Sequence, residues 1–242
     1  MRTYNKKPFL LEEHLDRLLN TAKEMGMQHA YTKAQLTEVV HEGIRRSKHP
    51  ELYIKLILTG GVNADGITPG KPSLILLFLA AGSFPAEYRS RGVALQTVTH
   101  ERYLAVAKSL NYMTAVVELQ RARAAGFQDV LYVGADGAVL EGTTVNFFIV
   151  RTGKLYTAEE GVLYGCTRKH ILRLAKELGI ECVLGKLTKG DVAAADEAFI
   201  SSTTRELHPV VRIDTTTVGA GTPGAVTLRL MQAFEASRSL IV

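Results

Sequence analysis

The chain contains no tryptophan and only two cysteines, Cys166 and Cys182, among its 242 residues. The two cysteines do not form a CxxC pair, so neither a disulfide scaffold nor a zinc site is expected, and a reducing compartment fits the sequence. The seven histidines form no HxH or HExxH group, so we predict no bound metal.

Long apolar runs are also absent. No run approaches the length of about 18 residues that a membrane-spanning helix needs. The first residues, MRTYNKKPF, lack the apolar core of a signal peptide. We therefore expect a soluble cytoplasmic protein that has no membrane partner.

The composition is typical of a globular protein with a moderate excess of basic residues. Hydrophobic residues make up 46% of the chain and the formal net charge is +5. This composition allows a sizeable core, in one large domain or in two modest ones. The basic residues are scattered, and the densest run, IRRSKH at 44–49, favours a solvated helix end over a nucleic-acid site. A basic protein still attracts anionic ligands.

The first third of the chain predicts mixed α/β structure. Apolar periodicity predicts helices over 9–27 and 32–47, the second beginning at a threonine suited to an N-cap. An alternating strand over 51–61 ends at a pair of glycines, and the apolar run 74–81 predicts a buried strand. The segment 82–92, which combines Gly, Pro and charge, is a candidate linker.

The rest of the chain alternates strands with helices. A strand over 93–100 is followed by a predicted helix over 102–126, which includes Lys108 and stops at a glycine. Asp136-Gly137 and Thr152-Gly153 predict the turns of two hairpins. Further helices and strands are predicted at 167–179, 180–187, 197–202, 209–214 and 224–237.

Two segments could hold an anion. In YGCTRKH a glycine precedes Cys166 and Thr167 at the start of a helix, where amide groups and the helix dipole attract negative charge. In AFISSTTRE a strand runs into four hydroxyl residues, Ser201–Thr204, which could cradle a phosphate. Taken alone, each segment is better explained by ordinary structure, an N-cap at Thr167 and a polar turn at the strand end.

Two further residues complete a pattern. Glu141 ends an apolar strand, where a carboxylate could pair with a ring nitrogen, although a surface hairpin glutamate is the common alternative. Lys108 lies amid Leu, Ala and Val, and burial there would favour a neutral, nucleophilic amine, although most lysines lie at the surface. An amine, a carboxylate and two anion cradles are together the parts that pyridoxal 5'-phosphate needs.

Six segments follow one another along nearly the whole chain: FLLEEHLDRL (9–18), KSLNYMTAVVELQRARAAG (108–126), VLEGTTVNFFIV (139–150), LYGCTRKHIL (163–172), ADEAFISSTTRELHPVVRID (195–214) and VGAGTPGAVTLRLMQAF (218–234). In these segments and their order the chain resembles the class IV, or fold type IV, pyridoxal-phosphate aminotransferases. That family includes branched-chain and D-amino acid aminotransferases and aminodeoxychorismate lyase. The resemblance implies a small N-terminal α/β domain over 1–84, a linker over 85–92, and a larger barrel-like α/β domain over 93–242 that binds the cofactor. It also implies a homodimer.

The resemblance implies roles for individual residues. Lys108 would hold the cofactor as a Schiff base, and Glu141 would keep the pyridine nitrogen protonated. Tyr112 would bond the ring hydroxyl, as in branched-chain members, and Leu163 would pack on the ring face. The remaining cofactor-binding residues implied are Arg17, which would pair with the phosphate, Cys166 and Thr167 at the helix start, Ser202 and Thr203 in the second cradle, and Asn146. The Thr203-Thr204 backbone would bind the substrate carboxylate.

Three positions depart from the family pattern. D-amino acid members trap the substrate carboxylate with Arg-x-His in a loop that here reads GVNADGITPGKPS and contains neither residue. Cys166 stands where Ile is usual, a change that a role for the backbone tolerates. Family members have a few dozen residues before the point matching Met1, so either the chain is truncated, or the small domain is reduced and the pocket more open.

The expected activity is transfer of an amino group between an amino acid, leaning to a branched-chain or other hydrophobic one, and a 2-oxo acid. A lyase of the aminodeoxychorismate type is one alternative, and a shortened protein that binds the cofactor with little activity is another. A nucleic-acid binder rests only on the basic charge, and we expect no nucleic-acid partner.

Overall fold

The computed structural model describes residues 1–239, which form two compact units. The small unit contains Met1–Ser83, Ala107–Ser109 and the chain from Ser237, and the large unit contains Phe84–Val106 and Leu110–Ala236. Each unit has a hydrophobic core of its own.

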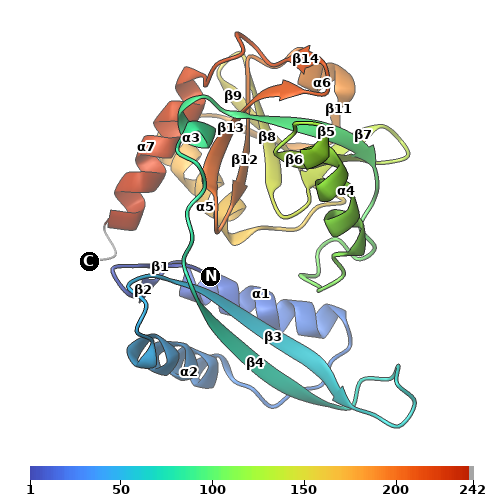
Figure 1. Ribbon diagram of the computed structural model, residues 1–242, viewed down its shortest axis with the longest axis vertical. Coiled ribbons are helices and arrows are strands. Elements are labelled where there is room, and N and C mark those ends of the chain that lie inside the picture. The colour runs from blue at the N-terminus through green and yellow to red at the C-terminus, as the bar shows by residue number, and fades with distance from the viewer. Residues whose placement is uncertain (240–242) are drawn as a thin grey trace. The chain divides into compact units, whose positions relative to one another are not determined.

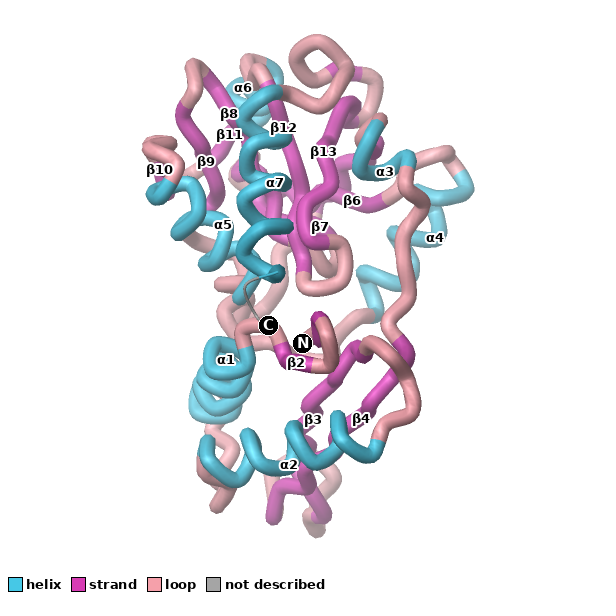
Figure 2. Tube along the Cα trace, turned by 90° about the vertical axis from the view of Figure 1, so that its left-hand side faces the viewer, coloured by secondary structure: helices cyan, strands magenta, loops and turns pink. Residues whose placement is uncertain are grey.

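The small unit is a long β-hairpin with helices on one face (Figure 2). Its elements are β1 (Thr3–Tyr4), β2 (Lys7–Pro8), α1 (Leu11–Glu24), α2 (Lys33–Arg46), β3 (Leu52–Val62) and β4 (Lys71–Ala80). β3 and β4 pair antiparallel, and both helices pack against the face that carries Leu52 and Ile54. Thr32 begins α2 as predicted: its hydroxyl accepts from Gln35 N (3.2 Å), and the Gln35 side chain accepts from Thr32 N (2.9 Å).

Strand β4 is exposed at alternate residues, so the prediction of a buried strand over 74–81 is wrong. The inward set packs under the helices: Leu74, Leu76 and Phe78. The outward set is between 38% and 45% exposed: Ile75, Leu77 and Leu79. A continuous apolar run is typical of a sheet covered on both faces, whereas this hairpin has its own helices on one face only.

The large unit is built around a closed ring of strands. The ring runs β8 (Asn146–Arg151), β12 (Glu197–Ser202), β13 (Glu206–Ile213), β5 (Val93–Thr99), β6 (Asp129–Val133) and β7 (Ala138–Gly142), and β7 pairs with β8 to close it. Strands β9 (Lys154–Ala158), β10 (Cys182–Gly185), β11 (Leu187–Thr188) and β14 (Thr216–Thr217) extend the ring at its margins. The predicted barrel-like α/β fold is therefore confirmed.

Alternation along the ring strands separates an inner core from an outer one. Phe147 and Ile200 point into the ring, where they join a buried aliphatic cluster. Phe148 and Phe199 point outward and stack with ring centroids 4.6 Å apart. Helices α5 (Cys166–Glu177) and α7 (Ala225–Ser239) lie on one side of the ring and α4 (Met113–Ala124) on another, while α3 (Glu87–Ser90) and α6 (Lys189–Ala193) are short (Figure 1).

Glycines form the predicted turns. Gly137 and Gly153 have φ angles of 80° and 76°, as hairpin turns require, and Gly126 ends α4 with a φ of 84°. The first half of the predicted 102–126 helix is wrong, because α4 begins only at Met113 and residues 102–112 are turns and irregular structure. There the backbone N–H of Lys108 donates to Thr21 Oγ1 (3.1 Å) and not to a helical carbonyl.

No helix within residues 1–239 combines the length and the apolar character that crossing a bilayer would require.

His208 of β13 makes folding sensitive to acid. It is 2% exposed, and Phe84 and Tyr88 meet its ring edge to face. Burial, reinforced by the charges of Arg205 and Arg89, lowers the pKa of His208 to about 4. An unfolded chain takes up the proton near pH 6.5, so this histidine stabilises the fold above that pH, and the contribution is lost as the pH falls toward 4.

We therefore expect His208→Gln to flatten the pH dependence of the free energy of unfolding. Between pH 7 and pH 4.5 the native chain should lose about 2 to 3 kcal/mol more than the variant, measured by urea unfolding at each pH. His49→Gln, at an exposed position, is the control and should follow the native curve. Parallel curves for the native chain and His208→Gln would refute the prediction.

Candidate functional site

Glu141, at the end of β7, is buried and fully engaged. The residue is 4% exposed, and its Oε1 accepts from Arg102 Nη1 at 2.7 Å. Oε2 accepts from Asn146 Nδ2 and from Leu163 N, both at 3.1 Å. The alternative of a surface hairpin glutamate is therefore wrong. A guanidinium and two N–H donors complement a negatively charged carboxylate and fix its direction.

Asn146 links the Glu141 carboxylate to the segment that leads into α5 through two hydrogen bonds. Besides donating to Glu141, its Nδ2 donates to the carbonyl oxygen of Leu163 at 2.8 Å. Gly165 lies so close that a Cβ there would stand 2.2 Å from Asn146 Oδ1. The glycine before Cys166 is therefore required by packing against Asn146.

The start of α5 is not capped by a side chain. Gly165 is the N-cap residue and provides none, so the interpretation of Thr167 as an ordinary N-cap is wrong. Lys169 N donates to the carbonyl of Gly165, which leaves the amides of Thr167 and Arg168 before the first intrahelical bond. Cys166 and Thr167 are 2% and 4% exposed. A buried, uncapped helix start suits an anion.

Of the four consecutive hydroxyl residues, Ser201 and Ser202 end β12 on opposite faces, and Thr203 and Thr204 lie in the turn that follows. Ser201 pairs across the strands with Asn146, is 1% exposed, and its Oγ has no hydrogen-bond partner within residues 1–239. Ser202 faces the other way, where its Oγ accepts from Arg205 N at 3.2 Å and lies 3.2 Å from Thr204 Oγ1. Ser201 is thus the hydroxyl beside the Glu141–Asn146 group, and strand alternation could have distinguished it from Ser202.

The small unit contains a second group of residues, along α1. His14, Arg17 and Thr21 lie three and four residues apart, and Arg17 Nη2 is 3.3 Å from His14 Nδ1. Burial holds the pKa of His14 well below its usual value, and the charges of the N-terminal amine, Arg17 and Lys108 lower it further. The uncharged imidazole therefore lies in a positive environment, which suits a phosphate group.

Two of the predicted residues differ from expectation in their surroundings. Lys108 is exposed and lies outside the helix, so the predicted dry, apolar environment is wrong. Tyr112 is half-buried and stands at the N-cap of α4. Arg102 was missed by sequence reasoning, because nothing in the letters around it indicates that it reaches Glu141 across 39 residues.

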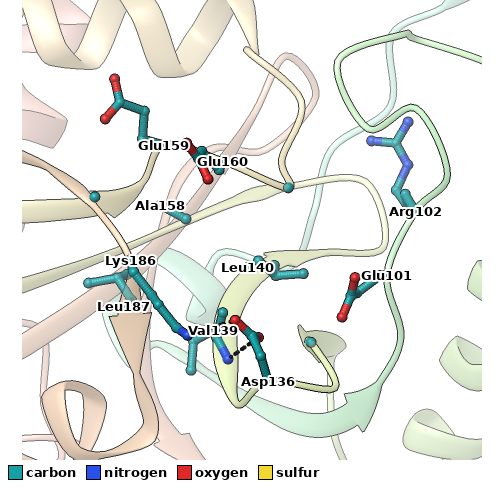
Figure 3. A pocket seen from close by; sticks show the side chains of 14 residues that line it. Glu101, Arg102, Asp136, Val139, Leu140, Ala158, Glu159, Glu160, Lys186 and Leu187 are labelled. Atoms are coloured by element: carbon teal, nitrogen blue, oxygen red, sulfur yellow. Dashed lines mark hydrogen bonds and ion pairs between the residues drawn. The ribbon is translucent and has the colours of Figure 1, made fainter.

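Arg102 also lines a cavity of about 450 Å³ in the large unit (Figure 3). Glu101, Asp136 and Lys186 share its wall, and Lys186 Nζ pairs with Asp136 Oδ2 at 2.6 Å. None of the residues predicted to bind cofactor or substrate lines this cavity. Its lining carries four carboxylates, Glu101, Asp136, Glu159 and Glu160, against the two cations Arg102 and Lys186, and this excess of negative charge does not suit a phosphate.

The donor set of the large unit fits pyridoxal 5'-phosphate. A fixed, buried carboxylate can meet a protonated ring nitrogen, and the uncapped start of α5 can meet a phosphate. The buried Ser201 hydroxyl, which lacks a partner within the described chain, offers one more bond. Asn146 joins these segments, because it pairs with Ser201 across β8–β12 and with Glu141 across β7–β8, and it donates to the Leu163 carbonyl before α5.

Comparisons with known proteins agree with this fit. The sequence profile of the family "Amino-transferase class IV" matches residues 1–213. A Methanocaldococcus jannaschii protein, provisionally named a branched-chain-amino-acid aminotransferase, is 35% identical over 99% of this chain and 85% of its own. The D-alanine aminotransferase of Bacillus licheniformis is 30% identical over 98% of this chain and 85% of its own.

Solved structures show the same likeness. The crystal structure of the T.th. branched-chain amino acid aminotransferase with pyridoxamine 5'-phosphate has a TM-score of 0.92 and 31% identity, covering 100% of this chain and 84% of that one. The Escherichia coli branched-chain amino acid aminotransferase has a TM-score of 0.90 and 30% identity, covering 97% of this chain and 83% of that one.

Gly165→Ala tests the packing at this site. The added methyl must displace Asn146, so we expect a loss of about 1 to 3 kcal/mol in the free energy of unfolding, measured in urea. Gly185→Ala is the matched control, because a Cβ at Gly185 meets nothing within 4 Å. It should change stability by less than about 0.5 kcal/mol. Equal stability of the two variants would show that Gly165 is not constrained by Asn146.

Proposed function

This chain belongs to the class IV aminotransferases, and from that premise we propose that Lys108 holds the cofactor as a Schiff base during transfer of an amino group from a hydrophobic amino acid to a 2-oxo acid. The family uses pyridoxal 5'-phosphate, so the protein is a pyridoxal-phosphate-dependent aminotransferase. The strongest support for the residue assignments is Glu141, whose buried carboxylate is aimed by Arg102, Asn146 and Leu163.

When bound, the cofactor supplies an electrophilic carbon and a ring that accepts electrons. Glu141 would hold the ring nitrogen in its protonated form, because its carboxylate is the acceptor that a pyridinium N–H requires. Lys108 would act as the base that takes the α-proton of the amino donor. Tyr112 would bond the ring hydroxyl, and Leu163, which is 7% exposed, would pack on the ring face.

We assign the cofactor phosphate to a positively charged side chain and to backbone amides. Arg17 supplies a guanidinium, and its environment on α1 is positive. Cys166 and Thr167 supply amides at the uncapped start of α5. Ser202 and Thr203 are the residues predicted to form the second phosphate cradle. We propose that Ser201 also contributes to this cradle, because its buried hydroxyl lacks a hydrogen-bond partner within residues 1–239.

The substrate carboxylate is assigned to the backbone of Thr203 and Thr204. The loop GVNADGITPGKPS offers no arginine or histidine that could trap a carboxylate in its place. Because no charged residue is identified that would bind a charged side chain of the amino donor, a hydrophobic amino donor is favoured. The names of the relatives include both a branched-chain and a D-alanine aminotransferase, so L- and D-donors must be assayed separately.

The activity is tested by a half-reaction followed by absorbance. The protein is loaded with pyridoxal 5'-phosphate and titrated with L-leucine, L-valine, D-alanine and L-lysine. Conversion of the cofactor spectrum by a hydrophobic donor, followed by recovery with 2-oxoglutarate, is the expected result. Pyruvate release from aminodeoxychorismate without an acceptor would establish the lyase alternative. A cofactor spectrum that no donor changes would establish a binding protein without this activity.

Lys108→Ala tests the assignment of the Schiff base. Borohydride reduction of the loaded native protein should add the mass of the reduced cofactor to the peptide that contains Lys108, and the variant should gain no such mass. We expect the rate of the half-reaction in the variant to fall by at least about 10²- to 10⁴-fold. Lys186→Ala, which removes the partner of Asp136, is the control and should keep both the adduct and the rate. A cofactor adduct that persists in Lys108→Ala would exclude this role.

We also propose a homodimer located in the cytoplasm. The outward face of β4 carries Ile75, Leu77 and Leu79 side by side and exposed, and an apolar face of this kind favours association with a second copy. Neither cysteine forms a disulfide, in keeping with a reducing compartment. Light scattering should give twice the chain mass of 26.4 kDa. Leu77→Lys should shift the protein toward 26.4 kDa, and a native protein that is monomeric at all concentrations would contradict the proposal.

A further inference from the structure

Two buried charged residues, Arg205 and Glu206, directly follow the hydroxyl residues Ser201–Thr204. They are 8% and 4% exposed. Each has a partner of opposite charge: Arg205 Nη2 lies 2.8 Å from Asp129 Oδ2, and Glu206 Oε2 lies 2.7 Å from Arg89 Nη1. Burying ion pairs costs desolvation, and apolar residues of similar volume often stabilise a fold equally well. Stability alone is therefore a weak reason for charge at this place.

Asp129 connects the Arg205 guanidinium to the segment that follows Glu141. Asp129 is 0% exposed and begins β6. Its Oδ1 accepts from Thr143 Oγ1 at 2.7 Å and from Thr143 N at 3.3 Å. Arg205 reaches the same segment directly, because its Nη1 donates to Thr144 Oγ1 at 3.3 Å. Two nitrogens of the planar guanidinium thus reach two different groups, in the fixed fork geometry that distinguishes arginine from lysine.

The turn that carries Thr203 and Thr204 is held in a strained form. Glu206 has a φ of 58°, in the left-handed region where glycine is the ordinary residue. Such a conformation persists where surrounding contacts determine it. Here the contacts are the Arg89 pair at Glu206, the bond from Arg205 N to Ser202 Oγ, and the Phe84 ring, whose centroid lies 5.0 Å from Arg205 Cζ.

The Asp129–Arg205 pair therefore spans two chain segments that the ring of strands does not pair directly. One segment runs from Glu141 through Thr143 and Thr144, and the other is the turn between β12 and β13. The first ends the strand that carries the carboxylate assigned to the cofactor ring. The second offers the amides assigned to the substrate carboxylate.

We propose that Arg205 and Asp129 are positioning residues for the Thr203–Thr204 turn, and that they set the orientation of the amides that receive the substrate carboxylate. This role rests on the proposed function. Neither side chain touches the reacting atoms. Their effect comes through the turn, and a displacement of about 1 Å in a group that positions substrate can cost on the order of 10²-fold in rate.

The test uses three variants of the full chain loaded with cofactor: Arg205→Met, Asp129→Asn, which keeps an oxygen acceptor for Thr143, and the double variant Asp129→Asn/Arg205→Met. Each single variant leaves one buried charge without its partner and should unfold at lower urea concentration than the native chain. The double variant removes both charges and should recover most of that loss. It therefore separates stability from positioning.

The expected result is a change in substrate binding and not in cofactor binding. In the double variant the KM for the amino donor should rise about tenfold or more, with a smaller change in kcat and a cofactor Kd within about twofold of native. The Kd of 4-methylvalerate, a carboxylate without an amino group, should rise to a similar extent. Arg205→Lys keeps the charge and loses the planar fork, so it should restore stability more fully than KM.

Hydrogen exchange gives a readout that does not depend on activity. Peptides that contain Thr203 and Thr204 should exchange faster in the double variant than in the native chain, while peptides from β9 should not change. Lys154→Met/Glu181→Leu removes an exposed ion pair of the same unit, 2.7 Å long, and is the matched control. It should alter neither KM nor exchange at the turn.

The outcomes are distinct. A double variant with native KM, native 4-methylvalerate affinity and native exchange at the turn would overturn the positioning role. Loss of cofactor affinity in proportion to the rise in KM would also overturn it, because the pair would then support the whole unit. A native protein that reacts with no amino donor would refute the proposed function, while faster exchange at the turn would still identify the pair as its support.

Discussion

The structure of the large unit depends on one closing contact. The ring of strands closes between β7 and β8, and the residues that pair there are Glu141 and Asn146. Closure therefore brings the carboxylate to its amide donor, and Leu163 completes the group from the segment before α5. The cluster inside the ring is apolar.

Burial explains why the two carboxylates in this region each lie against an arginine. A carboxylate that is 4% exposed and an aspartate that is 0% exposed are costly unless charges and N–H groups complement them. Arg102 serves Glu141, and Arg205 serves Asp129. The start of α5 differs in that no side chain caps it, and Ser201 differs in that its hydroxyl has no hydrogen-bond partner within residues 1–239. A polar surface of this kind is suited to an anionic ligand.

Local rules predicted much of the fold. Glycine at turns and helix ends and the N-cap at Thr32 depend on residues close together in the chain, and the structure confirms them. Two predictions failed because their causes are distant. The helix expected around Lys108 is replaced by irregular structure fastened to Thr21, 87 residues away. The apolar run over β4 predicts a strand that is buried on both faces, but the helices of the small unit cover only one face of this strand.

The sequence by itself determined the family, the order of the elements and the residue types that the chemistry needs, because all of these are carried by letters and their spacing. Only the tertiary structure decided which residues meet. It showed that Arg102 holds Glu141, that Ser201 and not Ser202 faces Asn146, and that Arg205 joins the hydroxyl turn to Asp129. The physical reason is that each of these contacts joins segments tens of residues apart, and their geometry follows from the closure and register of the strands.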